Sequence, residues 1–395
     1  MHVVFRESHG LEEAETPFDP GQDPAELVVL SFSDSDLGAF AAGWHRARSG
    51  GNGQALPEVR LQNLIALKHP VSVDTYVERT LSGAKAILIR LIGGEAYWPY
   101  GLASVQDLAR RTGIALAVLP ADGRPDPALD AASTLPVSTL RRLQELCDAG
   151  GAVAAQAALA QLCLAAGLYA GPVPGDKRVP EIGFYDPAKG VIAAPPDGPL
   201  VLVSFYRSYL TSADTAPVDA LILALRAAGF GACGVFAPSL KAPGFADWLH
   251  QWLETCAPVA IVNATAFSAR SDDGSTPFDA AGCPVFQVAL STARRRDWVA
   301  SDRGLSPADL AMHVVLPEVD GRLFAGIVSF KSPGKRDHYL QFARFCHRAD
   351  ADSVDRVVRK VQAWHRLATT PAADRQVGVV LSTYPGRAHQ LAHAV

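Results

Sequence analysis

The sequence is poor in the features that mark nucleic-acid-binding and membrane proteins. Its 36 lysines and arginines are outnumbered by 40 aspartates and glutamates, the net charge is -4, and no basic stripe predicts contact with phosphates. No apolar run reaches the roughly 18 residues of a membrane-spanning helix. Residues 1–18 are acidic and polar, without the apolar stretch of a signal peptide. We therefore expect a cytoplasmic protein that binds neither nucleic acid nor membrane.

Cysteine is also scarce. The six cysteines are scattered, with no C-x-x-C pair and no cysteine–histidine cluster at the spacing of a zinc site. This distribution argues against a disulfide framework and predicts reduced thiols that pack as small apolar side chains.

Three well-known ligand motifs are missing or incomplete. No G-x-x-x-x-G-K-[ST] loop occurs, so the chain is not expected to hydrolyse ATP itself. Gly229, Gly231 and Gly234 match G-x-G-x-x-G, but a predicted helix precedes them and a predicted strand follows, the reverse of what a dinucleotide site requires. His389 and His393 have the spacing of a metal-binding helix without its glutamate. We assign no metal ligand.

Apolar residues are plentiful, and in the first third of the chain they form short runs. At 395 residues, with 49% hydrophobic residues, the chain is long enough for two or three domains. The runs at residues 27–31, 86–91 and 114–119 are separated by helical patterns, which is typical of a parallel sheet covered on both faces. They predict an N-terminal α/β domain over residues 1–130.

The middle of the chain changes character. Helical patterns at residues 137–149 and 152–166 predict a helical hairpin, so we expect a connector over residues 131–170. The next segment, residues 171–199, carries seven prolines and several glycines, which favours a linker.

The alternation of strands and helices then resumes. Apolar runs such as residues 200–206 and 259–263, with a long amphipathic helix over residues 354–367, predict a second α/β domain over residues 200–370. Within residues 376–395, VGVVL at residues 377–381 predicts a buried first strand of a third unit. The predicted fold class is therefore α/β, with two doubly wound, mainly parallel-sheet domains, a helical hairpin and Pro/Gly-rich linker between them, and the start of a third unit.

Two loops carry residues suited to binding. The segment GGEAYWPYG, residues 93–101, places three aromatic rings after a strand; these rings either stack on a flat macrocycle or cap the edge of the sheet. In residues 304–321, Glu318 and Asp320 lie two positions apart in a loop bounded by proline and glycine. The two carboxylates either meet a cation or amide groups, or belong to a solvated turn.

Several runs together resemble the CobN type of large subunit of the aerobic cobaltochelatase, which is related to the large porphyrin-binding subunit of magnesium chelatase. VVLSTYPGR near the end of the chain is also similar. The runs that carry the resemblance are KHPVSVDTYVERTL from Lys68, GGEAYWPYG from Gly93, VLVSFYRSYLTSADTAPVDAL from Val201, NATAF from Asn263 and GLSPADLAMHVVLPEVDG from Gly304.

The resemblance implies an activity for the complex to which such a subunit belongs. That activity is the ATP-driven insertion of Co²⁺, a substrate metal, into hydrogenobyrinic acid a,c-diamide in cobalamin synthesis. The implied partners are an AAA+ ATPase subunit, which with ATP and Mg²⁺ supplies the energy, and a subunit with a metal-binding domain. The family's H-x-G-x-H-G-x-x-E motif does not occur in this chain. We therefore assign no catalytic residue and expect the chain alone to be inactive.

The resemblance also directs attention to the second domain as part of a corrinoid cleft. Doubly wound folds bind ligands beyond the carboxyl ends of their strands. The substrate-binding candidates chosen on this rule are Tyr206, Asp214, Asn263, Thr265, Glu318 and Asp320.

Two other interpretations remain open at this point. The chain could belong to a magnesium chelatase and meet a porphyrin instead of a corrinoid. Alternatively it is a non-catalytic head that docks onto a separate body chain through the segment after Gln376.

Overall fold

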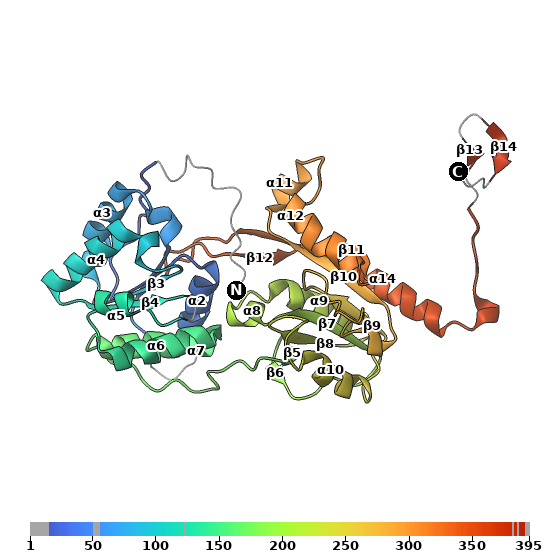
Figure 1. Ribbon diagram of the computed structural model, residues 1–395, viewed down its shortest axis with the longest axis horizontal. Helices are drawn as coiled ribbons and strands as arrows, with labels where there is room; N and C mark the ends of the chain where they lie inside the picture. Colours follow the sequence, from blue (N-terminus) through green and yellow to red (C-terminus); the bar gives the residue numbers. More distant parts are fainter. Residues whose placement is uncertain (1–15, 50–55, 122–123, 381–382, 385–386, 392–395) are drawn as a thin grey trace.

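The computed structural model describes residues 16–49, 56–121, 124–380, 383–384 and 387–391 (Figure 1). These residues contain two units, each built on its own β-sheet, and a small two-stranded sheet near the end of the chain. The prediction of an α/β protein with two mainly parallel sheets is confirmed.

The first unit is a four-stranded parallel sheet with strand order β2-β1-β3-β4. Helices α2, α6 and α7 cover one face, and α3, α4 and α5 cover the other, so the strands are buried on both sides. The elements are β1 (Leu27–Ser31), α2 (Asp34–Ser49), β2 (Val59–Asn63), α3 (Pro70–Arg79), β3 (Ala86–Leu91), α4 (Pro99–Thr112), β4 (Ala115–Pro120), α5 (Pro127–Ala132), α6 (Val137–Ala149) and α7 (Gly151–Ala165).

The helical pair α6 and α7 packs against the first sheet, where it was expected to stand between two domains. Leu143 and Leu159 share a buried cluster with Leu37 of α2 and Leu88 of β3. Helix α7 approaches α2 closely because the residues of both helices at this contact are small. A side chain at Gly43 would lie 2.6 Å from a backbone nitrogen of α7. The pair is therefore a layer of the first unit.

The second unit is an eight-stranded sheet with strand order β12-β11-β10-β9-β7-β8-β5-β6. The five central strands are parallel; β12 pairs antiparallel at one edge, and the antiparallel strands β5 and β6 extend the other edge. Helices α9 and α14 pack on one face and α10 on the other. The elements are β5 (Gly183–Asp186), β6 (Gly190–Ile192), β7 (Leu200–Tyr206), α8 (Arg207–Thr211), α9 (Ala216–Ala227), β8 (Gly231–Ala237), α10 (Phe245–Leu253), β9 (Ala260–Asn263), β10 (Val285–Ser291), α11 (Arg295–Val299), α12 (Pro307–Leu310), a π-helical turn (Ala311–Val315), α13 (Leu316–Glu318), β11 (Leu323–Pro333), β12 (Phe345–Ala349) and α14 (Ala351–Thr369).

The segment predicted as a linker is not a linker throughout. Within it, β5 and β6 form an antiparallel hairpin that extends the second sheet beyond β8. Phe184 and Tyr185 are buried there, and Asp186 forms an ion pair with Arg226 of α9 at 2.7 Å. Pro187 lies in the turn of this short hairpin and the other prolines lie outside it, so none interrupts a strand, although composition alone suggested a linker.

The predicted buried strand at residues 377–381 is wrong for the described part. Residues 377–380 have no regular structure, and the Val377 and Val380 side chains are 85% and 92% exposed. Leu381 lies outside the described residues. The chain leaves α14 and continues to a hairpin of β13 (Thr383–Tyr384) and β14 (Arg387–Leu391), so no neighbouring strand covers the valines (Figure 1).

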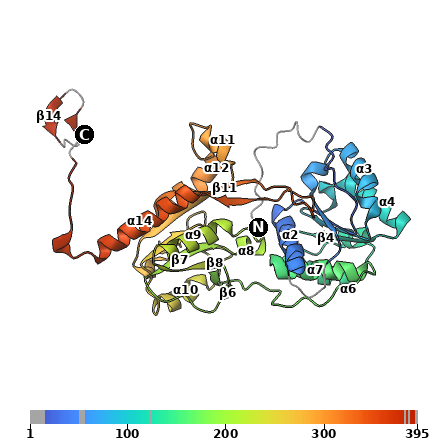
Figure 2. The same ribbon diagram turned by 180° about the vertical axis from the view of Figure 1, so that it is seen from behind.

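Strands β11 and β12 were not predicted, and the loop between them joins the two units. We call this loop, residues 334–344, the arm. Both ribbon views show the ends of β11 and β12 reaching from the second sheet toward the first unit (Figure 2). The arm residues Leu340 and Phe342 are buried in the same cluster as Trp44 and Val59 of the first unit.

Candidate functional site

The carboxyl ends of β1 and β7 lead into segments that meet between the two units, and we call this meeting place the junction. On one side lies the beginning of α2, and on the other lie residues 212–214, which follow α8; α2 and α8 are neighbours in both ribbon views. A side chain at Gly38 would lie 2.9 Å from the Ser212 carbonyl oxygen, so the backbones are in close approach. Ligands bind at the carboxyl ends of such sheets, which makes the junction the candidate site.

Arg344 of the arm joins the two sides of the junction. Its Nη2 donates hydrogen bonds to the carbonyl oxygens of Ser212 and Ala213, both at 2.7 Å. The guanidinium lies where a side chain at Gly38 would otherwise stand, 2.8 Å from that position. Glycine at this point of α2 therefore makes room for the arginine.

Asp214, one of the predicted substrate-binding residues, lies at the junction. Its two carboxylate oxygens accept hydrogen bonds from the backbone nitrogen of His347, at 3.0 and 3.3 Å. Burial raises the pKa of Asp214 above its ordinary value, while the nearby charges of Arg344 and Lys331 partly oppose this. The carboxyl group thus ties the loop after α8 to strand β12.

His347 is a neutral imidazole beside Asp214. The side chain is buried, its Nδ1 lies 3.1 Å from the Ser329 hydroxyl, and its ring centroid lies 5.7 Å from that of Tyr209. Burial, together with the positive charge of Lys331 and the proximity of His313, lowers the pKa of His347 to about 3. At neutral pH this ring is therefore uncharged, with one N–H donor and one acceptor nitrogen.

The first unit contributes a charged rim to the junction. Arg90, at the end of β3, is buried and forms ion pairs with Asp36 of α2 at 3.2 Å and Asp148 of α6 at 3.1 Å. Burial alone would lower the pKa of Arg90, but the two carboxylates hold it above its ordinary value. The triad fixes the beginning of α2 and the end of α6 against the carboxyl end of the sheet.

Four other predicted residues come together beside the junction, close to the carboxyl ends of β7 and β9. Asn263 Nδ2 donates to Gln287 Oε1 at 2.7 Å, and the Thr265 hydroxyl donates to Asn263 Oδ1 at 2.9 Å. Tyr206 donates its hydroxyl to the Ala266 carbonyl at 2.7 Å. Ser204 also hydrogen-bonds to Asn263.

Asp320 closes this network through an ion pair with Arg322. The Arg322 Nη2 lies 2.6 Å from Asp320 Oδ2, and the two side chains are 2% and 1% exposed. Arg322 Nη1 also donates to Gln287 Oε1 at 3.3 Å, and Asp320 accepts from the Ala269 nitrogen at 2.7 Å. Burial lowers the pKa of Arg322, with the Asp320 charge opposing that effect. Apart from Arg322 Nε, which is buried without a hydrogen-bond partner among the described residues, these groups satisfy one another, so their role is to hold the loop at residues 264–269 in place.

Glu318 is separate from this network. Its side chain is exposed, whereas Asp320 is buried, so the two carboxylates do not face one shared ligand.

In the part of the chain that the structure describes, no group of three or more histidine, cysteine, aspartate or glutamate side chains is placed to hold a metal ion. Likewise, none of the described helices combines the length and the apolar character needed to cross a membrane.

In the aromatic loop after β3, one ring caps the sheet and the other two are exposed. Trp98 is buried and donates its indole nitrogen to the Leu67 carbonyl at 2.8 Å, as a structural cap would. Tyr97 and Tyr100 are 64% and 47% exposed, and Tyr100 donates its hydroxyl to Asp74 at 2.7 Å. The loop caps the sheet and also presents two rings to solvent.

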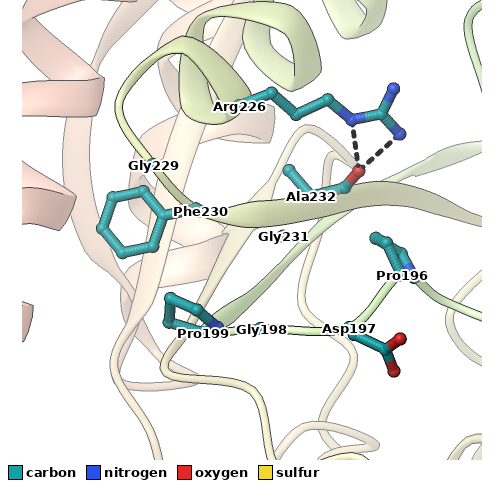
Figure 3. Close-up of a pocket in the computed structure, with 9 residues that line it drawn as sticks. All are labelled: Pro196, Asp197, Gly198, Pro199, Arg226, Gly229, Phe230, Gly231 and Ala232. Carbon is teal, nitrogen blue, oxygen red and sulfur yellow. Dashed lines mark hydrogen bonds between the residues drawn. The ribbon is translucent and has the colours of Figure 1, made fainter.

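A hollow of about 390 Å³ lies at the opposite, amino end of the second sheet (Figure 3). Figure 3 shows Arg226 in its wall, with Nε and Nη2 both bonded to the Ala232 carbonyl oxygen at 2.9 and 2.7 Å. Its glycines include Gly229 and Gly231, which form the predicted helix-to-strand turn. The position at the amino ends of the strands argues against a ligand site.

Sequence reasoning missed several residues that complete the site. Gln287 gave a usable signal, since it is a polar residue inside the otherwise apolar strand VFQVALS. Arg322, Arg344 and His347 gave none, because the strands that position them were not predicted.

Comparison with known proteins gives results that agree with one another. A family model described as CobN/Magnesium Chelatase matches residues 149–395. The chain is 34% identical over 416 aligned residues to the aerobic cobaltochelatase subunit CobN of Sinorhizobium sp, and 32% identical over 411 to that of Pseudomonas aeruginosa. Each alignment covers 100% of this chain and 32% of the relative, so the chain spans about a third of the length of these curated relatives.

Two further proteins resemble this chain, one over 53% of its length and the other over 91%. A magnesium-chelatase subunit from Rhodobacter capsulatus is 29% identical over 236 residues, which is 53% of this chain and 19% of that protein. The catalytic subunit of cobaltochelatase from Mycobacterium tuberculosis superposes with a TM-score of 0.68 at 25% sequence identity. That match covers 91% of this chain and 29% of the solved one. The resemblance drawn from the sequence motifs is confirmed.

Proposed function

The chain belongs to the CobN/magnesium chelatase family, and from that premise we propose that it supplies the front portion of the large subunit of a cobaltochelatase. The observation that carries this proposal is similarity to two CobN subunits over 100% of the chain. Similarity to the magnesium-chelatase protein of Rhodobacter capsulatus extends over only 53%. The difference in extent favours the cobalt enzyme over the magnesium enzyme, which remains the alternative.

The reaction proposed for the whole complex is the insertion of Co²⁺ into hydrogenobyrinic acid a,c-diamide. Cobalt is a substrate here, and ATP with Mg²⁺ would be used by an AAA+ partner subunit, with a further partner carrying a metal-binding domain. The absence of a P-loop in this chain fits such a division. The H-x-G-x-H-G-x-x-E motif of the resemblance does not occur in the chain, so we propose that it binds and does not catalyse alone.

We place the corrinoid at the junction. A corrinoid carries carboxylate and amide side chains, which are recognised by cationic and hydrogen-bonding groups. Arg344 and Lys331 supply positive charge beside Asp214, and Asp214 itself accepts hydrogen bonds. In this proposal Tyr206, Asn263, Thr265 and Asp320 act indirectly by holding the neighbouring loop, and exposed Glu318 is a rim residue.

The test is a titration of the purified chain with hydrogenobyrinic acid a,c-diamide, with a porphyrin as the control ligand. Visible absorption of the corrinoid and quenching of tryptophan fluorescence report binding. We expect selective binding in the micromolar range, about -8 kcal/mol. Preference for the porphyrin would support the magnesium enzyme instead, and binding of neither ligand would overturn the placement of the corrinoid in these two units.

A matched pair of variants locates the ligand. Asp214→Asn, at the junction, is expected to weaken corrinoid binding about tenfold, a cost of about 1.4 kcal/mol. The control is Asp297→Asn. Asp297 belongs to an exposed ion pair away from the junction, so this change is expected to leave the affinity unchanged. Equal affinities of the two variants would exclude a direct role for Asp214.

A further inference from the structure

The arm lies along helix α2 in the opposite chain direction. At one end Arg344 meets Gly38, and at the other end Asp337 Oδ2 lies 2.7 Å from His45 Nε2. Near this second end the Arg48 guanidinium also lies 3.9 Å above the centre of the Tyr339 ring. The second unit thus contacts α2 both near the beginning and near the end of the helix.

Two apolar side chains anchor the arm in the core of the first unit. Leu340 is 1% exposed and Phe342 is 9% exposed, in a cluster with residues of α2 and β2. Arg60 Nη1 donates to the Tyr339 carbonyl at 2.9 Å, and Gln22 Nε2 donates to the Gln341 carbonyl at 3.0 Å. Several polar contacts of the arm are exposed, which is typical of a contact that can open locally.

The base of the arm continues into the junction. Arg344 bonds to the carbonyls of Ser212 and Ala213, and three residues later the His347 nitrogen donates to Asp214. Movement of the arm therefore changes the contacts of Asp214 and of the first turn of α2 together.

A hollow between the units, next to the junction, measures about 160 Å³. It is lined by Gly150 and Gly151 of the first unit and by Lys177, Val179 and Leu210, among others. Pockets for drug-sized ligands occupy about 300–1,000 Å³, so a macrocycle does not fit in this hollow while the units stay in place.

We propose that the arm is a clasp that keeps the junction closed, and that its release from α2 lets the two units separate to admit a large ring. The inference rests on the proposed function only in its choice of ligand, because the clasp itself is a property of the free chain. The arm contacts the first unit without a covalent link. The chain itself connects the two units through the irregular segment before β5.

The experiment compares three variants of the chain in the absence of any ligand. Leu340→Ala/Phe342→Ala removes the apolar anchors. Tyr339→Ala is a milder change, since Tyr339 is 48% exposed and its loss leaves no large core cavity. Lys335→Ala is the control, because this exposed arm residue has no ion pair among the described residues. Circular dichroism first establishes that each variant is folded.

Hydrogen exchange and small-angle scattering then report separation. We expect exchange at residues 33–38 and 212–214 to become about tenfold faster in the anchor variant, less in Tyr339→Ala, with Lys335→Ala unchanged. The radius of gyration should rise in the same order. A folded anchor variant with native exchange at both segments and an unchanged radius would overturn the clasp, whatever the outcome of the corrinoid titration.

Addition of the corrinoid separates the two proposals. If the clasp controls entry, the anchor variant binds the ring with a faster association rate than the parent chain, by about tenfold. Faster exchange without any corrinoid binding would support the clasp and contradict the proposed ligand. Binding at an unchanged rate in an opened variant would show that the ring does not enter through the junction.

Discussion

The two sheets carry different polar chemistry at their carboxyl ends. In the first unit the buried group is a cation, Arg90, and its carboxylate partners Asp36 and Asp148 are 20% and 37% exposed. In the second unit the buried groups are mostly neutral amides and hydroxyls around Asn263 and Gln287, completed by one dry ion pair.

The difference follows from access to water. A charged group keeps its charge at low cost when its partners are partly hydrated, as at the first rim. Where water is excluded, unpaired charge is expensive, so neutral hydrogen-bonding groups fill the second network and Arg322 is matched directly to Asp320. The ion pairs of the first rim can rearrange at low energetic cost, whereas the second network holds a loop in a fixed position.

The largest effect is expected from breaking the dry pair. Arg322→Met leaves Asp320 buried without its cation, which should lower the free energy of unfolding by about 3–5 kcal/mol. Urea denaturation followed by circular dichroism measures the loss. The control Arg296→Met removes an ion pair whose side chains are 75% and 57% exposed, and it should cost less than about 1 kcal/mol.

The double variant Asp320→Leu/Arg322→Met tests whether the uncompensated charge of Asp320 causes this loss of stability. It removes both charges together, so most of the lost stability should return. A double variant as unstable as Arg322→Met alone would show that packing around the pair, and not the uncompensated charge, sets the cost.

A smaller effect is expected at the first rim. Arg90→Met should lower the free energy of unfolding by about 2 kcal/mol, because Asp36 and Asp148 can regain water when their partner is lost. The exposed pair of Arg111 and Asp107 supplies the control, Arg111→Met. If Arg90→Met proved as costly as Arg322→Met under the same denaturant conditions, the contrast between a hydrated rim and a dry network would be wrong.

An effect of similar size, which is lost only at lower pH, concerns the pH dependence of stability. The folded-state pKa of His347 is about 3, below its ordinary value, so the unfolded chain takes up a proton as the pH falls through about 6.5 and the folded chain does not. The contribution is fully present above pH 6.5 and declines toward pH 3, with a loss of about 2 kcal/mol between pH 7 and pH 5.

Paired denaturation curves at pH 7 and pH 5 measure this contribution. His347→Asn, which keeps a hydrogen-bonding group near Ser329, should reduce the pH dependence by about that amount. His338→Asn, at an exposed arm position, should leave it unchanged. An identical pH dependence in parent and His347→Asn would mean that the imidazole is charged in the folded chain.

The strands that could be predicted share one property. β1, β3, β7 and β10 are apolar runs buried on both faces, and such runs are readable without any partner strand. β11 lacks this signature, because it is partly exposed and its pairing with β10 is interrupted by two register shifts.

Part of the polar network could be predicted from the sequence in the same way. The rule that ligands gather at carboxyl strand ends chose Tyr206, Asn263, Thr265 and Asp320, and the structure brings these four into one network. The rule could not show that the network is closed on itself. That property depends on Gln287 and Arg322, whose contacts come from the register of neighbouring strands and not from local sequence.

The arm also sets an order of events when the chain is made. Gln22 bonds to Gln341, 319 positions later, and Leu340 belongs to the core built around β1 and β2. A ribosome that has released the first sheet has therefore not yet released the residues that seal it. The first unit must wait for nearly the whole second unit to be synthesised, so its early form exposes apolar surface for chaperones to protect.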